Sequence, residues 1–385
     1  MIYLDNSATT PLHPKVKEAI SNALDLFGNP SSMHSTGRQV RAMLEESRKD
    51  IADFFNCNPD ELIFTAGASE ANNTVLKSST TCCAFCNENH GHIITSNIEH
   101  PSVQNTLQCL SHQHVEVTEV NVNSNGVIDP KDVEAAIRPD TMMISIMYVN
   151  NEIGTIQPIK EITEIAKKHN IPMHTDAVQA VGKLPIDLQE LPVDFLSMSG
   201  HKIYAPKGIG ILFKRKSAKN ICPLITGGHQ ENSMRAGTEN TLGIIALGEA
   251  IRQAKREMEE NKDRIGKLRD KLEQGILKNL DKVKINGDPN NRVYNITNLS
   301  FTNIEGESIL LRLDMHGIAV STGSACSTGN LEPSYVITAL GVDPEIAHSS
   351  IRFSLGRETT EEDVDKTIEA VTETITFLRK ISPIK

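Results

Sequence analysis

Short apolar runs alternate with amphipathic stretches through the first two thirds of this 385-residue chain, and this alternation restricts its fold more than any other feature. Between the runs lie stretches such as residues 158–169, where isoleucine and alanine recur at helical steps of three and four residues. Seven runs have the length and composition of strands: residues 61–65, 92–96, 114–122, 142–149, 171–175, 195–198 and 208–213. The pattern predicts an α/β fold with a large, mainly parallel, seven-stranded sheet covered by helices.

The last third of the chain has a different pattern. A long helix is expected from about residue 241 to residue 280, apolar at first and then densely charged. Strands and helices of a smaller unit follow, at residues 283–285, 293–301, 306–316, 351–354 and 361–379. We therefore expect a large domain over residues 15–255 and a smaller α+β domain built from residues 1–14 and 256–385.

Composition excludes some classes of function. The 39 basic and 49 acidic side chains give a net charge of −10, which argues against a broad nucleic-acid-binding surface. No apolar run approaches the roughly 20 residues that span a bilayer, and the first residues lack the pattern of an export signal. Seven cysteines, an odd number, favour a reducing compartment. We expect a cytoplasmic protein that binds neither membranes nor nucleic acid.

A lysine placed after a strand is the first candidate for chemistry. Lys202 follows the run at residues 195–198, and Asp176 ends the preceding predicted strand. Lysine forms a Schiff base with an aldehyde cofactor, and a carboxylate at the pyridine nitrogen makes pyridoxal phosphate an electron sink. Gln179 can address the phenolic oxygen of that ring, while Ser199 and His201 can donate to its phosphate. A single lysine is more often a surface charge, so the prediction rests on the combination.

Other candidates also lie at the ends of predicted strands. Ala68 and Ser69 open a helix, whose backbone N–H groups and Ser69 hydroxyl can hold a phosphate; an ordinary helix cap is the alternative. His100 precedes Pro101, so it can stack on a ring and move protons, or simply cap a helix. Asn151 can hold a substrate carboxylate or the ring hydroxyl. Carboxyl ends of parallel strands gather at one edge, where ligands bind.

Two further residues suggest a substrate and a nucleophile. Cys326 lies among small and hydroxyl residues between glycines, which favours an exposed thiol over a buried structural one. Arg352 lies in a strand pattern and can pair with the carboxylate of an amino acid, although a structural ion pair is the alternative.

Together these motifs resemble the cysteine desulfurases of the NifS/IscS type, which are pyridoxal-phosphate enzymes of fold type I related to class V aminotransferases. The resemblance covers nearly the whole chain, and the shared segments occur in the same order. They are YLDNSATT at 3–10, GNPSS at 28–32, NNEIG at 150–154, SGHK at 199–202, GGHQE at 227–231, MRAGT at 234–238, GSAC at 323–326 and RFSLGR at 352–357.

The resemblance implies a role for each candidate. Lys202 carries the cofactor as a Schiff base, Asp176 pairs with the pyridinium, His100 stacks on the ring and Gln179 contacts its oxygen. The phosphate ligands implied are Ala68, Ser69, Ser199 and His201, and Thr238 reaches the phosphate of a neighbouring subunit, which implies a homodimer. Asn151 and Arg352 orient the carboxylate of the substrate.

The implied reaction converts L-cysteine to L-alanine and leaves the sulfur on Cys326, in the small domain, as a persulfide. That sulfur is passed to an acceptor protein such as an iron–sulfur scaffold, or to other thiolated products. Two alternatives stay open: a selenocysteine lyase, and a non-catalytic scaffold that keeps the fold. An ordinary aminotransferase has no need of the Cys326 segment.

The sequence departs from the family at two places. Serine stands at position 69 where the family usually has threonine, which keeps the hydroxyl donor. The second departure is an unusual cluster of side chains: Cys82, Cys83, Cys86, His90 and His92. Metal binding or sulfur relay is an alternative role for this cluster. Its spacing fits no standard zinc motif, so we expect adventitious thiols and no bound metal.

Overall fold

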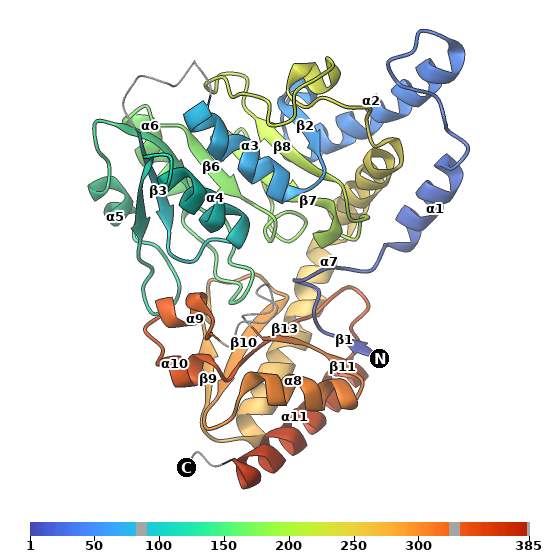
Figure 1. Cartoon of the computed structure of the whole chain (residues 1–385). Coiled ribbons are helices and arrows are strands. Elements are labelled where there is room, and N and C mark those ends of the chain that lie inside the picture. The colour runs from blue at the N-terminus through green and yellow to red at the C-terminus, as the bar shows by residue number, and fades with distance from the viewer. Residues whose placement is uncertain (82–90, 323–331, 383–385) are drawn as a thin grey trace.

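The structure is a computed structural model that describes residues 1–81, 91–322 and 332–382 (Figure 1). It has a large lobe and a small lobe, each built on its own sheet, and one long helix runs through both. The predictions for Cys82, Cys83, Cys86, His90 and Cys326 lie outside the described residues.

The large lobe contains the predicted seven-stranded sheet, with strand order β2-β8-β7-β6-β5-β3-β4. The strands are β2 (Leu62–Thr65), β3 (His92–Ser96), β4 (Glu116–Val120), β5 (Thr141–Ser145), β6 (Met173–Asp176), β7 (Phe195–Ser199) and β8 (Gly210–Lys214). Strands β3 to β7 pair in parallel, and β8 is antiparallel to both of its neighbours, β7 and β2. The predicted α/β fold with a mainly parallel sheet is confirmed.

One predicted strand is longer than the observed one. The apolar run at residues 142–149 predicts a strand to its end, but β5 stops at Ser145. Beyond it, the N–H groups of Ile146 and Tyr148 donate to carbonyls of β6, and Val149 forms an isolated bridge with Ile156. The apolarity of this run reflects burial, because Ile146, Met147 and Val149 are buried in the core outside the regular ladder.

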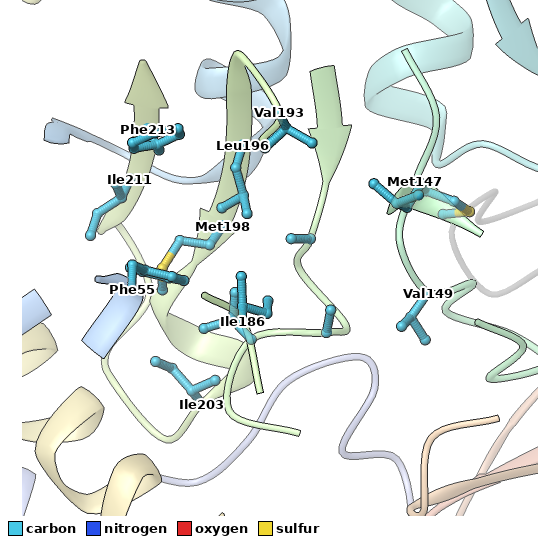
Figure 2. Packing of buried hydrophobic residues seen from close by; sticks show 14 of the residues in the cluster. Phe55, Met147, Val149, Ile186, Val193, Leu196, Met198, Ile203, Ile211 and Phe213 are labelled. Atoms are coloured by element: carbon cyan, nitrogen blue, oxygen red, sulfur yellow. The ribbon is translucent and has the colours of Figure 1, made fainter. Parts of the chain in front are cut away.

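Alternate side chains of the strands enter different hydrophobic clusters. Leu196 and Phe213 belong to the larger cluster, which also takes in Phe55 at the end of α2 (Figure 2), whereas their neighbours Phe195 and Leu212 belong to another. Successive side chains of a strand point to opposite faces, so each face of the sheet has its own core. A sheet buried on both faces requires helices on both sides, and every residue of the central strands β6 and β7 is buried.

The helices of the large lobe provide those two covers. They are α1 (Pro14–Ala23), α2 (Ser35–Phe55), α3 (Ala68–Thr81), α4 (Pro101–Ser111), α5 (Pro130–Ala135) and α6 (Ile159–Lys168). Helix α3 packs on α4 and on β7 and β8, while α2 packs on the long helix α7 (Thr241–Asn279). In α6, Ile159, Ile162 and Ala166 are buried, so the amphipathic pattern at residues 158–169 is confirmed.

The small lobe holds a four-stranded antiparallel sheet of order β12-β13-β10-β9. Its elements are β9 (Val283–Asn286), β10 (Ile296–Phe301), α8 (Gly306–Met315), β11 (Ile318–Ala319), β12 (Ser321–Thr322), α9 (Tyr335–Ala339), α10 (Pro344–Ala347), β13 (Ser350–Ser354) and α11 (Glu361–Ile381). The short strand β1 (Ile2–Tyr3) pairs in parallel with β11, which brings the N-terminus to this lobe (Figure 1).

The two lobes share helix α7. Its first half contributes Ile244 and Ile251 to the large-lobe core, and its second half contributes Leu272 and Ile276 to a core that also contains Leu4. This distribution supports the proposed division near residue 255, with the N-terminal residues on the side of the small lobe. No helix among the described residues is long and apolar enough to cross a membrane.

A buried ion pair connects α7 to the small sheet. Arg292 donates to both carboxylate oxygens of Glu273, at 2.8 and 2.9 Å, and the side chains are only 3% and 9% exposed. The hydroxyl of Thr297 donates to the same carboxylate. Removal of one partner leaves the other charge buried without compensation, which is more costly than the pair itself is stabilising.

We therefore expect Arg292→Met to lower the free energy of unfolding by about 3 kcal/mol, measured by urea denaturation. The matched control is Lys271→Met. Lys271 lies in α7, as Glu273 does, and it also forms ion pairs, but its side chain is 36% exposed. Exposed pairs contribute little, so the control should change the free energy by less than about 1 kcal/mol. Equal effects of the two substitutions would contradict the expectation that breaking the buried Arg292–Glu273 pair is the more costly change.

Candidate active site

A cavity of about 540 Å³ lies where the carboxyl ends of the parallel strands meet the small lobe. The predicted residues that line it are Ala68, Ser69, His100, Asn151, Asp176, Gln179, Ser199, His201, Lys202 and Arg352. Strands β3, β6 and β7 pair in parallel, so the residues that follow or end them reach the same edge of the sheet. Thr238 does not line this cavity. It is exposed and lines a separate hollow of about 270 Å³.

Lys202 lies directly after β7, in a short 3-10 helix over Gly200–Lys202. Its Nζ donates to the carbonyl oxygen of Ala8 at 2.6 Å and to that of Ser7. Both carbonyls belong to the N-terminal segment that crosses from the small lobe. The side chain is half-buried and lines the cavity, so it is not the surface charge that a lone lysine after a strand usually is.

Asp176, the last residue of β6, presents a buried carboxylate to the same cavity. One oxygen accepts the backbone N–H of Val178 at 3.0 Å, and the other accepts the side-chain amide of Asn72 at 2.8 Å. Hydrogen bonds to the ionised form favour the charged carboxylate. The sequence analysis did not single out Asn72, whose place in the middle of α3 carries no recognisable motif.

His100 satisfies both of its predicted roles, as a helix cap and as a cavity residue. It is the N-cap of α4, and its Nδ1 accepts the backbone N–H of Ser102 at 3.1 Å. The neutral ring therefore carries its proton on Nε2. Burial lowers the pKa of His100, Asp176 acts in the opposite direction, and the charge of Lys202 lowers the pKa further. The ring is thus neutral near pH 7.

One end of the cavity has the donors expected for a phosphate. Ala68 and Ser69 open the 14-residue helix α3, and the first N–H groups of a helix have no acceptor within it. Ser199 and His201 line the cavity beside them. Burial, then the charges of Lys202 and Lys207, lowers the pKa of His201 to about 4, so its ring is neutral and can donate or accept. Lys207 also lines the cavity and was not predicted.

The small lobe contributes Arg352, from β13. Its Nη2 is 2.7 Å from the Asp5 carboxylate, and its Nη1 donates to the backbone oxygen of Asn151 at 3.0 Å. Arg352 therefore forms a structural ion pair with Asp5 and also lines the cavity. Arg352 Nε is buried without a hydrogen-bond partner within the part of the chain that the structure describes. Such an orphaned donor is costly, and a bound anion could satisfy a group of this kind.

Gln179 is fixed by its neighbours. Its Nε2 donates to the Ser7 carbonyl at 3.0 Å, and its Oε1 accepts from Lys183 Nζ at 3.3 Å. One N–H of the amide is consequently left for a ligand in the cavity. Lys183, four residues along the chain, is buried, and this burial together with the charge of Lys202 lowers its pKa to about 7.

His92 has both ring nitrogens occupied. They lie 2.9 Å from the Thr141 hydroxyl and 2.8 Å from the Thr118 hydroxyl, and the residue is fully buried in β3. Among residues 1–81, 91–322 and 332–382, no group of three or more His, Cys, Asp or Glu side chains could hold a metal ion. The other candidates of the Cys82–His92 cluster lie outside these ranges, so its role stays a prediction.

Comparison with known proteins agrees with the fold. The family model of class V aminotransferases matches residues 2–367. The chain belongs to this family. It is 49% identical to a cysteine desulfurase IscS of Dictyoglomus turgidum, over the whole chain and 97% of that protein. It is also 49% identical to a cysteine desulfurase IscS of Methanosarcina thermophila, over the whole chain and 94% of that protein.

The same relationship holds at the level of structure. A solved NifS-like protein superposes with a TM-score of 0.91 at 37% sequence identity, and the match covers 98% of this chain and all of the other. The resemblance to NifS/IscS-type proteins and the fold type I architecture, both predicted from sequence motifs, are confirmed by these matches.

Lys183 should make stability depend on pH. A lysine whose pKa is lower in the folded than in the unfolded protein destabilises the fold below the folded pKa, and the penalty disappears as pH rises toward the unfolded value. We expect Lys183→Met to raise the free energy of unfolding relative to the native chain most at pH 7 and below. The difference should shrink by about 1 to 3 kcal/mol toward pH 10.

Denaturation at a series of pH values measures this difference. Lys160→Met is the matched control, because Lys160 is exposed in α6, and its difference from the native chain should be flat over the same range. A flat difference for Lys183→Met as well would show that the lysine remains charged at neutral pH.

Proposed function

We propose that this protein is a pyridoxal-phosphate-dependent cysteine desulfurase. It converts L-cysteine to L-alanine and transfers the sulfur to Cys326 as a persulfide, which supplies iron–sulfur cluster assembly or other thiolation. The observation that carries the proposal is the presence of Lys202, Asp176 and His100 in one cavity of a chain that is 49% identical to cysteine desulfurases.

The described residues fit pyridoxal phosphate. Lys202 offers an amine to the aldehyde, and Asp176 offers a buried carboxylate held by donors from Asn72 and Val178, suited to a protonated pyridine nitrogen. The N-terminus of α3 has unpaired N–H groups for the phosphate. The uncommitted N–H of Gln179 suits the ring oxygen. When bound, the cofactor would delocalise the electron pair left on the substrate Cα.

The side chains of the cavity then have separate tasks. Arg352 and Asn151 hold the substrate carboxylate, since Arg352 retains an unsatisfied Nε. The amine of Lys202, once displaced, takes the Cα proton. His100, neutral and protonated on Nε2, lines the cavity and would exchange a proton with the substrate at that nitrogen. Residues of both lobes line the cavity, so these groups converge on one bound substrate.

Sulfur transfer requires a nucleophile that the cofactor does not supply. In the proposed step, the Cys326 thiolate attacks the sulfur of the bound L-cysteine and an S–S bond forms. The C–S bond breaks with its electron pair left on carbon, which is then protonated, so the products are a Cys326 persulfide and alanine. No external oxidant or reductant is needed, because the new S–S bond replaces the C–S bond and the electron pair of the C–S bond stays on carbon.

The partners follow from the same proposal. Thr238 is exposed and lines a hollow that shares Ala66 and Gly208 with the cavity but does not line the cavity itself, which supports its proposed contact with the phosphate site of a second subunit in a homodimer. The persulfide is passed to an acceptor protein such as an iron–sulfur scaffold. A cytoplasmic location stays a prediction from composition, as does the absence of direct binding to nucleic acid.

Two alternative functions predict different behaviour. A selenocysteine lyase would need no persulfide on Cys326, and a non-catalytic scaffold would need no cofactor. The combined presence of Lys202, Asp176 and His100 in one cavity counts against a scaffold, since nothing in packing alone requires an amine, a carboxylate and an imidazole to share it.

The first expected result concerns the cofactor. The purified protein should be yellow, and Lys202→Ala should lose this visible absorbance together with turnover of L-cysteine, because no other amine can take over the Schiff base at that position. Lys214→Ala, at the end of β8, is the control and should retain both. A colourless native protein that does not take up added pyridoxal phosphate would overturn the proposed function.

The second expected result separates desulfurase from lyase. Cys326→Ala should reduce alanine and sulfide formation from L-cysteine by a factor of about 1,000 or more, because the sulfur loses its acceptor. Cys109→Ala, the control, removes an exposed thiol of α4 and should leave the rate unchanged. Turnover of L-cysteine that survives in Cys326→Ala would contradict the desulfurase mechanism, and turnover of selenocysteine that survives in this variant would indicate a selenocysteine lyase.

A further inference from the structure

A hydrogen-bonded chain behind the cavity joins two residues that have no direct bond to each other. Asn72, fully buried in α3, donates from Nδ2 to Asp176 Oδ2 at 2.8 Å and to the hydroxyl of Ser102 at 2.9 Å. That hydroxyl lies 2.8 Å from His100 Nδ1. One buried amide therefore contacts the carboxylate directly and the imidazole through a single hydroxyl.

The direction of each hydrogen bond follows from the groups involved. A carboxylate only accepts, so the nitrogen of the Asn72 amide must face Asp176, and both hydrogens of that nitrogen are used. Ser102 Oγ accepts one of them, which leaves its own hydrogen for His100 Nδ1. Asn72 Oδ1 has no hydrogen-bond partner within the described ranges. An orphaned oxygen is costly, so the arrangement is retained at the expense of stability.

We propose that Asn72 is a positioning residue that sets the states of Asp176 and His100 together. It holds the Asp176 carboxylate in a fixed orientation, and it turns the Ser102 hydroxyl so that this group joins the Ser102 backbone N–H in donating to His100 Nδ1, which leaves the proton on Nε2. The part of this inference that concerns the cofactor rests on the proposed function. The part that concerns His100 does not.

The charges around His100 indicate the effect of removing Asn72. The pKa of the ring responds to the Asp176 carboxylate of β6 and to the Lys202 ammonium that follows β7, the two charged groups among the described residues that act on it. Without Asn72, the backbone N–H of Ser102 still donates to Nδ1, but the Ser102 hydroxyl no longer has an enforced donor direction, and Asp176 loses a hydrogen bond that partly balances its charge. Both changes favour the protonated ring.

The test uses the full-length protein with isotope-labelled histidine, and His100→Gln identifies the His100 signal in magnetic resonance spectra. Asn72→Leu and Ser102→Ala should each raise the ratio of protonated to neutral His100 by about threefold or more at fixed pH. Asn72→Leu should also weaken pyridoxal phosphate binding by about tenfold, because the Asp176 carboxylate is no longer held in place.

Asn286→Leu is the matched control. Asn286, in the edge strand β9, is also a buried asparagine whose Nδ2 donates twice, to Asn298 and Ser300, and whose Oδ1 lacks a partner within the described ranges. Its loss should affect stability as much as the loss of Asn72, yet leave the His100 ratio and the affinity for the cofactor unchanged. Equal effects from both leucine variants would reveal only a general loosening of the fold and would overturn the proposal.

The outcomes for the two proposals are distinguishable. An unchanged His100 ratio in Asn72→Leu overturns the positioning role, and if that variant does not fold, an unchanged ratio in Ser102→Ala overturns it instead. An unchanged cofactor affinity in Asn72→Leu overturns the part that concerns Asp176. If the native protein takes up no pyridoxal phosphate, the proposed function fails, while the His100 titration still decides the role of Asn72.

Discussion

Parallel pairing of β3, β5, β6 and β7 is the constraint from which the rest of the site follows. Backbone hydrogen bonds along these strands bring their carboxyl ends to one edge, so Asp176 and Lys202, 26 positions apart in the chain, meet in one cavity. The strands are buried on both faces, which requires helices on both sides and leaves only that edge for a ligand. The apolar core and the polar cavity are therefore two results of the same topology.

The N-terminal segment completes the site from the other lobe. The carbonyls of Ser7 and Ala8 accept hydrogen bonds from Lys202, and Ser7 also accepts from Gln179, while Asp5 pairs with Arg352. A few residues next to the paired strand β1 thus contact groups from both sheets. The relative position of the lobes and the geometry of the cavity consequently depend on each other.

Burial sets the charge states around the cavity. It is the largest cause of the lowered pKa values of His100, His201 and Lys183, so these basic groups are neutral or easily made neutral near pH 7. Neutral imidazoles can donate and accept at the same time, which a protonated ring cannot. The cavity also holds the cationic side chains of Lys202, Lys207 and Arg352 beside the carboxylates of Asp176 and Glu70, so charged and neutral groups line it together.

The sequence by itself determined the class of fold, the approximate strands and helices, and most residues of the cavity, because apolar periodicity and strand-end motifs are local properties. It overestimated β5, since an apolar run reports burial whether or not the ladder continues. It could not reveal Asn72, Ser102 or Asp5 as partners of the site, because their roles arise from contacts between distant segments. Only the tertiary structure decided which donor faces which acceptor, and hydrogen-bond direction depends on a geometry that no single segment contains.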